Sequence, residues 1–151
     1  MQVKSAMTIK VITADREQLL PEAFSVLQEY RFHHLPVVDD KKIIGIVSDR
    51  DILRISSFEG GQVVVPSVPV TEVMSTPVVT CTPVTTIARA SKLMTENRIH
   101  CLPIIQFEHF IGLVTSTDIL LLLTTLDPSF VRQRLPFQYE IQNIHRLSAS
   151  V

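Results

Sequence analysis

Two short stretches of the chain place a hydroxyl side chain three residues before a carboxylate, where a helix is predicted to begin. They are Ser48–Asp51 and Thr115–Asp118. One interpretation is helix capping, because a Ser or Thr at a helix start accepts a backbone N–H bond and an acid suits the first turn. The other is ligand binding. A carboxylate can accept hydrogen bonds from two vicinal hydroxyls, as in ribose, and the hydroxyl with the helix start can hold phosphate.

These stretches belong to a longer internal repeat with one constant offset of 67 residues. The equivalent parts are Arg31–Val38 and Arg98–Ile105, Ile44–Leu53 and Ile111–Leu120, and the single residues Met7 and Met74. One register that holds across several unlike segments indicates two copies of a single small fold.

In each copy the pattern of apolar and polar residues predicts the element order β-α-β-β-α. In the first copy Val11–Thr13 predicts a strand, and apolar residues at helical spacing predict a helix over Gln18–Tyr30. The runs Leu35–Val38 and Ile43–Val47 predict two strands joined by a polar turn, and Asp49–Ile55 predicts a second helix. The second copy repeats this order and ends in an apolar helix.

We therefore divide the chain into repeat 1 (residues 1–55), a linker loop (56–67), repeat 2 (68–126) and a tail (127–151) with a weak helical pattern. A unit of about 50 residues buries too little apolar surface to be stable alone. We expect the repeats to pack about a pseudo-twofold axis as one α+β module. Such packing creates two related clefts, where small ligands tend to bind.

The repeated motifs resemble those of the CBS-domain family. They are Met-x-x-x-Val, Leu-Pro-Val-Val-Asp and Gly-x-x-Ser/Thr-x-x-Asp, found at Met7–Val11, Leu35–Asp39 and Gly45–Asp51, with copies at Met74–Val78, Leu102–Ile105 and Gly112–Asp118. The resemblance extends from Lys4 to about Leu126, and in size the chain is most similar to stand-alone bacterial CBS pairs and acetoin-utilisation-type proteins. It implies a Bateman module that binds an adenosyl ligand, namely AMP, ADP, ATP, NAD or S-adenosylmethionine.

The resemblance further implies that the carboxylate of one repeat acts together with the opening strand of the other. The eight candidate ligand-binding residues then form two sets: Asp118, Thr115, Ile12 and His33, and Asp51, Ser48, Val79 and His100. The Asp side chains would hold the ribose hydroxyls, and the aliphatic residues would sandwich the adenine. Arg31 and Arg98 could bind phosphate, although solvated groups at helix ends explain them as well. Arg50 has the neutral Thr117 as its equivalent, so phosphate binding by Arg50 would make the two sites unequal.

Three other kinds of function compete with ligand sensing. A metal site could use His33, His34, His100 and Cys101. Neighbouring residues on a strand point to opposite faces, however, and no C-x-x-C or H-x-x-x-H spacing occurs. An enzyme is not expected, because the chain has no G-x-S-x-G motif and no P-loop. A ligand-free structural dimerisation module would retain the repeats and remains an alternative.

Composition limits the partners and the compartment. The 151 residues carry a net charge of −1, so no basic excess favours nucleic acid or an anionic membrane. The longest apolar run, Ile119–Leu123, is far shorter than the roughly 20 residues of a membrane span. Two cysteines and no leader pattern over Met1–Lys10 favour a cytoplasmic protein. The resemblance adds a homodimer, a regulated enzyme or transporter as partner, and no catalytic cofactor.

Overall fold

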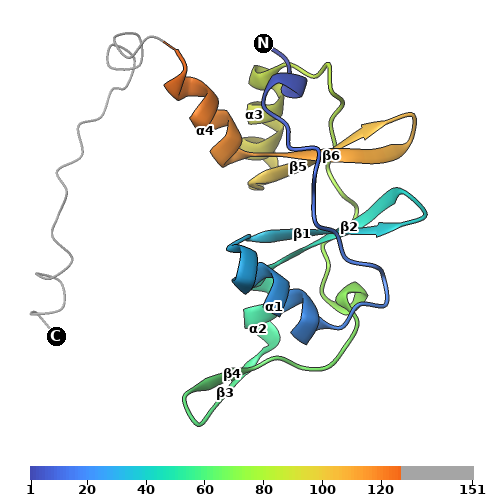
Figure 1. Ribbon diagram of the computed structural model, residues 1–151, viewed down its shortest axis with the longest axis vertical. Coiled ribbons are helices and arrows are strands. Elements are labelled where there is room, and N and C mark those ends of the chain that lie inside the picture. Colours follow the sequence, from blue (N-terminus) through green and yellow to red (C-terminus); the bar gives the residue numbers. More distant parts are fainter. Residues whose placement is uncertain (127–151) are drawn as a thin grey trace, which may run out of the picture. The chain divides into compact units, whose positions relative to one another are not determined.

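The computed structural model describes residues 1–126 of the chain (Figure 1). Residues 1–119 form one compact unit that holds nearly all of both repeats, and a second unit begins at Leu120. The predicted tail over residues 127–151 lies outside the described part. Among the described helices, none combines the length and the apolar character that a membrane crossing requires.

The two repeats contain equivalent elements in the same order. In repeat 1 these are α1 (Leu20–Tyr30), β1 (His34–Asp39), β2 (Lys42–Ser48) and α2 (Asp49–Ile55). In repeat 2 they are α3 (Ile87–Asn97), β5 (Cys101–Gln106), β6 (His109–Thr115) and α4 (Ser116–Thr124). Two short 3-10 helices, η1 (Val3–Ser5) and η2 (Val70–Glu72), begin the two copies.

Each repeat is built around one antiparallel hairpin. β1 pairs with β2, and β5 pairs with β6, with the same irregularity in register at equivalent positions. The β1–β2 turn uses Asp40 and Lys41 with φ of 45° and 63°, the left-handed conformation that a two-residue hairpin turn requires. Phe107 and Glu108 make the same turn in the second hairpin, with φ of 50° and 65°. The two hairpins are thus closed by turns of one kind.

Each repeat also has its own apolar core. The first consists of Ala14, Leu20, Ala23, Leu27, Leu35, Val37, Val47, Ile52 and Val70. The second consists of Val3, Cys81, Ala90, Met94, Leu102, Ile104 and Val114. Val70 comes from the start of copy 2 but lies in the core of repeat 1, and Val3 comes from the start of copy 1 but lies in the core of repeat 2. The starts of the two copies are therefore exchanged.

Backbone hydrogen bonds describe this exchange. We call residues 3–12 and 70–79 the first and second opening segments. In the first, Thr8 exchanges two backbone hydrogen bonds with Leu113 of β6, at 2.8 and 3.0 Å. In the second, Ser75 exchanges two with Ile46 of β2, at 2.8 and 3.3 Å. Each opening segment thus extends the hairpin of the other repeat before the chain crosses to its own.

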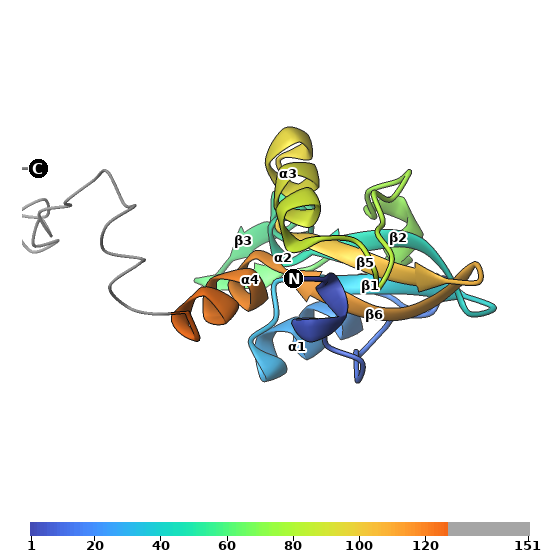
Figure 2. The same cartoon turned by 90° about the horizontal axis from the view of Figure 1, so that it is seen from above.

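The hairpins of the two repeats lie against each other inside the unit. β2 contacts β6, and the Phe110 N–H of β6 donates to the Lys41 carbonyl of the first hairpin at 2.8 Å. In Figure 1 the two hairpins occupy the middle of this unit, with α1 and α2 beyond one of them and α3 beyond the other, and in Figure 2, seen from above, the two hairpins overlap.

Two sequence predictions need correction. No strand forms over Val11–Thr13, because this stretch crosses between repeats, and only the adjoining Ala14 makes a single parallel bridge, to Val37. The predicted linker loop contains a hairpin, β3 (Ser57–Glu59) and β4 (Gln62–Val64). Its turn is Gly60-Gly61, and both glycines have positive φ.

Candidate functional site

A cleft of about 1000 Å³ lies between the two repeats, within the unit of residues 1–119. Its walls include all eight residues that the sequence analysis selected. They are Ile12, His33, Ser48, Asp51, Val79, His100, Thr115 and Asp118. The sequence analysis expected two related clefts, and the structure has one continuous cleft that is lined by the equivalent residues of both repeats.

The cleft is lined largely by equivalent pairs that obey the 67-residue offset. Besides the eight residues, such pairs include Thr8 and Ser75, Val11 and Val78, Arg31 and Arg98, and Ile46 and Leu113. Both opening segments line the cleft because they cross between the repeats at this place. The exchange of the starts therefore forms part of the cleft wall.

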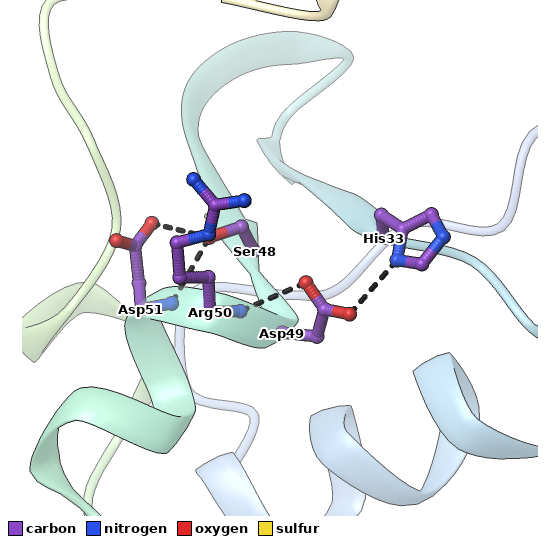
Figure 3. Close-up of polar contacts among 5 residues, drawn as sticks. All are labelled: His33, Ser48, Asp49, Arg50 and Asp51. Carbon is purple, nitrogen blue, oxygen red and sulfur yellow. Dashed lines mark hydrogen bonds and ion pairs between the residues drawn. The ribbon is translucent and has the colours of Figure 1, made fainter. Parts of the chain in front are cut away.

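The carboxylate of Asp51 is engaged through both of its oxygens. Ser48 is the N-cap of α2, and its Oγ accepts from the Asp51 N–H at 3.0 Å and donates to Asp51 Oδ2 at 2.7 Å (Figure 3). The second oxygen, Oδ1, accepts from Arg54 Nη1 at 3.2 Å. Both oxygens of Asp51 thus have a partner within the protein.

The carboxylate of Asp118 is engaged through one oxygen. Its Oδ2 accepts from the Thr115 N–H at 2.7 Å and from Thr115 Oγ1 at 2.8 Å. The Asp118 N–H donates back to Thr115 Oγ1 at 3.1 Å, which completes a reciprocal capping box. Within residues 1–126 no donor reaches Asp118 Oδ1. The capping interpretation is therefore satisfied at both helices, and at Asp118 it leaves an acceptor free.

His33 and His100 lie at equivalent points of the cleft but have different neighbours. His33 Nδ1 pairs with Asp49 Oδ2 at 2.8 Å, and the Asp49 N–H donates to the His33 carbonyl at 3.2 Å. Figure 3 shows Asp49 turned toward His33 and Asp51 turned toward Ser48. The residue equivalent to Asp49 is Ser116, whose N–H makes the same bond to the His100 carbonyl at 2.9 Å. Of these two histidines, His33 is the one that a carboxylate orients.

The residues considered for a metal site do not assemble into one. Among residues 1–126 no group of three or more His, Cys, Asp or Glu side chains is placed to hold a metal ion. Burial raises the pKa of the Cys101 thiol to about 12, which keeps it protonated, whereas a metal binds the thiolate. Burial likewise lowers the pKa of His34, opposed by the charge of Asp49. All four residues line the cleft between the repeats, where Cys101 is buried and His33 and His100 are exposed.

Sequence analysis missed several polar residues of the cleft. Lys10, Asp49, Arg54, Thr8 and Ser75 all line it. Arg54 was detectable in principle, since an Arg three residues after an Asp on a helix commonly forms an ion pair. Thr8 and Ser75 carried no such signal, because their position follows from the exchange of the opening segments.

The chain is similar to known proteins over most of its length. A model of the CBS domain matches the chain twice, over residues 3–57 and 70–125. The CBS domain-containing protein YhcV of Bacillus subtilis (strain 168) is 34% identical over 119 residues, which cover 78% of this chain and 81% of that protein. The repeat in the sequence and the two equivalent halves of the fold agree with this double match.

Two solved structures have a similar fold. One is the putative acetoin utilization protein AcuB from Vibrio cholerae, with a TM-score of 0.70 and 27% identity over 90% of this chain and 98% of that one. The other is the CBS domain pair of protein MJ0100 in complex with 5′-methylthioadenosine and S-adenosyl-L-methionine. It has a TM-score of 0.69 and 26% identity, and the match covers 82% of this chain and 99% of that chain.

Proposed function

Since this chain belongs to the CBS-domain family as a tandem pair of repeats, we propose that it is a regulatory module that binds an adenosyl ligand between them. The observation that carries the proposal is the cleft of about 1000 Å³, with a free carboxylate oxygen on Asp118. Small-molecule sites in proteins have volumes of roughly 300–1000 Å³ and few polar groups, so a nucleoside fits. The adenosyl compounds bound by the MJ0100 pair support this ligand class.

The chemistry of the lining residues suits an adenosyl group. Asp118 Oδ1 can accept hydrogen bonds from a ribose diol without losing the capping bonds that Oδ2 makes. Ile12 and Val79 offer apolar surface to the flat faces of an adenine, and Ile12 is 37% exposed. His33 and His100 are additional donors for a phosphate or a sugar oxygen.

Regulation would follow from the position of the cleft. A ligand held by both repeats favours the arrangement of the repeats that it fits best, and it shifts that equilibrium only by its difference in affinity. The changed surface would be read by a partner enzyme or transporter. We further propose that the module acts as a cytoplasmic homodimer and does not itself catalyse a reaction.

The test is a thermal-shift and calorimetry panel of AMP, ADP, ATP, NAD and S-adenosylmethionine. A ligand at about 100 times its Kd stabilises the folded state by about 2.7 kcal/mol, which raises Tm by roughly 5–10 °C for a chain of this size. Asp51→Ala and Asp118→Ala should each weaken binding. Asp15→Ala is the matched control, because Asp15 is exposed and is not among the residues that line the cleft.

Two results would contradict the proposal in different ways. If no adenosyl compound binds the unmodified chain, the sensor function is wrong, and a ligand-free dimerisation module becomes the better description. If both Asp variants bind with unchanged affinity, the ligand class stands but the residue assignment is wrong.

A further inference from the structure

Two carboxylates of the cleft, those of Asp51 and Asp118, differ in one respect that bears on ligand charge. We propose that Arg54 makes the Asp51 end of the cleft selective for phosphate-bearing adenosyl ligands, whereas the Asp118 end also accepts uncharged ones. This inference rests on the proposed function, because it specifies which adenosyl ligands each end takes. We call Ser48, Arg50, Asp51 and Arg54 the Asp51 end, and Thr115, Thr117 and Asp118 the Asp118 end.

The carboxylate oxygens of Asp51 and Asp118 differ in their hydrogen bonds within the protein. Asp51 Oδ2 accepts from Ser48 and Oδ1 accepts from Arg54, so each Asp51 oxygen already has one protein donor. Asp118 directs both bonds from Thr115 to Oδ2. Its Oδ1 receives no donor from the described residues 1–126. A ribose diol can therefore use an oxygen without any protein donor at Asp118, whereas at Asp51 it must share each oxygen with a protein donor and compete with Arg54 for Oδ1.

The two ends of the cleft also differ in the cationic residues that neighbour their Asp in the sequence. Arg50 and Arg54 both line the cleft beside Asp51. At the 67-residue offset their equivalents are the neutral Thr117 and Leu121. Two guanidinium groups thus stand at the Asp51 end, while the positions that correspond to them in copy 2 carry no charge.

A phosphate group on the ligand would compete with Asp51 for Arg54. The side chains of Arg54 and Asp51 are 69% and 24% exposed, and an exposed ion pair of this kind is weak. A phosphate oxygen offers the planar guanidinium a strong alternative acceptor. Arg54 can then leave Asp51 Oδ1 without losing a charged partner, which frees Asp51 for the ribose. An uncharged ligand provides no such exchange.

Other charged groups of the cleft do not reverse this difference. Arg31 and Arg98 both line the cleft, but they are an equivalent pair and so do not distinguish the two ends. Asp49 lies 2.8 Å from His33 Nδ1 and would repel a phosphate, but the cations Lys10, Arg50 and Arg54 outnumber it among the cleft residues. Lys10 lines the cleft and attracts anions, and its equivalent is Pro77. Within residues 1–126 Lys10 forms no ion pair with a carboxylate, so it adds attraction for phosphate without covering a ribose acceptor.

The experiment compares adenosine with AMP by calorimetry on variants that keep one end each. Asp118→Ala leaves the Asp51 end, where AMP should bind at least about tenfold more tightly than adenosine, the value of one charge-assisted hydrogen bond. Asp51→Ala leaves the Asp118 end, which should still bind adenosine. If melting curves show that Asp118→Ala is unfolded, Asp118→Asn replaces it.

The decisive variant is Arg54→Leu in the Asp118→Ala background, which installs the residue type found at the equivalent position of copy 2. Adenosine should bind up to about fivefold more tightly because Asp51 Oδ1 is uncovered. AMP should bind about tenfold more weakly because its cation is gone. Arg89→Leu is the matched control, since Arg89 is exposed on α3 and is not among the cleft residues.

The outcomes separate this inference from the proposed function. If neither ligand binds the unmodified chain, the proposed function itself fails. If both bind but Arg54→Leu leaves the ratio of the two affinities unchanged, the inference is wrong and the proposed function stands. Loss of all binding in the Asp118→Ala chain would also overturn the inference, because the Asp51 end would then hold no ligand.

Discussion

Two equivalent glycines, Gly45 and Gly112, lie where an opening segment crosses a strand of the other repeat, and they predict that the same substitution couples differently to the neighbouring Met in the two repeats. A Cβ added at Gly45 would overlap Met74 Sδ and lie 2.7 Å from Met74 Cγ. A Cβ added at Gly112 would lie 2.7 Å from the backbone oxygen of Thr8 but 3.5 Å from the Met7 side chain, an ordinary contact. The same added methyl group meets a side chain in one repeat and the backbone in the other.

The magnitudes follow from what each neighbour can do. Forcing a methyl group into packed surroundings costs about 1–3 kcal/mol, so Gly45→Ala and Gly112→Ala should each destabilise the protein by that amount. Met74→Ala removes the Sδ and Cγ atoms that the methyl group introduced by Gly45→Ala would strike. The Gly45→Ala, Met74→Ala double variant should therefore be more stable than the sum of the single effects by about 1 kcal/mol.

The second pair supplies the control. Met7→Ala leaves the Thr8 carbonyl in place, and Thr8 is fixed by its two hydrogen bonds to Leu113. Effects of Gly112→Ala and Met7→Ala should then add to within about 0.5 kcal/mol. Free energies of unfolding from urea titrations give both double-mutant cycles. Equal coupling in the two cycles would refute the reasoning, because it would mean that Gly45 and Gly112 meet the same kind of obstacle.

Two further predictions concern the interface between the repeats and the cores. Burial lowers the pKa of His34 in the folded protein below its usual 6.5. Well above pH 6.5 the imidazole is neutral in both the folded and the unfolded protein. As the pH falls through 6.5, the unfolded chain takes up the proton first. The free energy of unfolding should therefore decrease between about pH 7.5 and about pH 5.5. His34→Gln should make this decrease smaller in urea titrations. An equal decrease in the variant would show that His34 does not cause it. Leu35→Ala and Leu102→Ala should each cost about 2–5 kcal/mol and lower one shared unfolding transition, because each core contains a residue from the other copy. Two separate transitions in calorimetry would show that the repeats unfold independently.

Local features of the fold were predictable from the sequence. The constant offset identified two copies, and the tandem CBS pair and its α+β class are confirmed. The helix predicted over Asp49–Ile55 has these same bounds in the structure. Its start is encoded locally by the Ser48 cap, and its apolar face by residues such as Ile52. Capping and periodicity act within one or two turns, which is why a single sequence reveals them.

The hairpin inside the predicted linker was missed although its signal was present. Gly60-Gly61 stands between Phe58 and Val63, and a Gly-Gly pair between apolar residues is typical of a two-residue hairpin turn. The Val11–Thr13 strand was wrong for the opposite reason. Its β-branched residues suit a strand, but this stretch crosses between repeats and has no ladder partner among residues 1–126.

The candidate site was predictable in its residue types and less so in its contacts. The recurrence of Ser48–Asp51 as Thr115–Asp118 was enough to select two of the three carboxylates that line the cleft, but not Asp49. The difference between them was not visible, because it depends on the direction in which Arg54 turns and on which oxygen each cap uses. Such side-chain hydrogen bonds depend on residues that are neighbours in space. Both copies have the same Ser/Thr-x-x-Asp motif, so the motif alone does not reveal that these bonds differ.

The exchange of opening segments gives the family motifs a physical reason. The Met of one copy packs against the Gly of the other, as Met74 does against Gly45, because only a residue without Cβ lets the crossing segment approach that strand. The next residue of the segment, Ser75, bonds to Ile46 and also lines the cleft. Contacts that hold the repeats together and contacts available to a ligand thus belong to the same stretch of chain. If the proposed ligand binds in the cleft, it should change the stability of the repeat–repeat interface, and Gly45→Ala should alter the affinity for AMP measured by calorimetry as well as the free energy of unfolding.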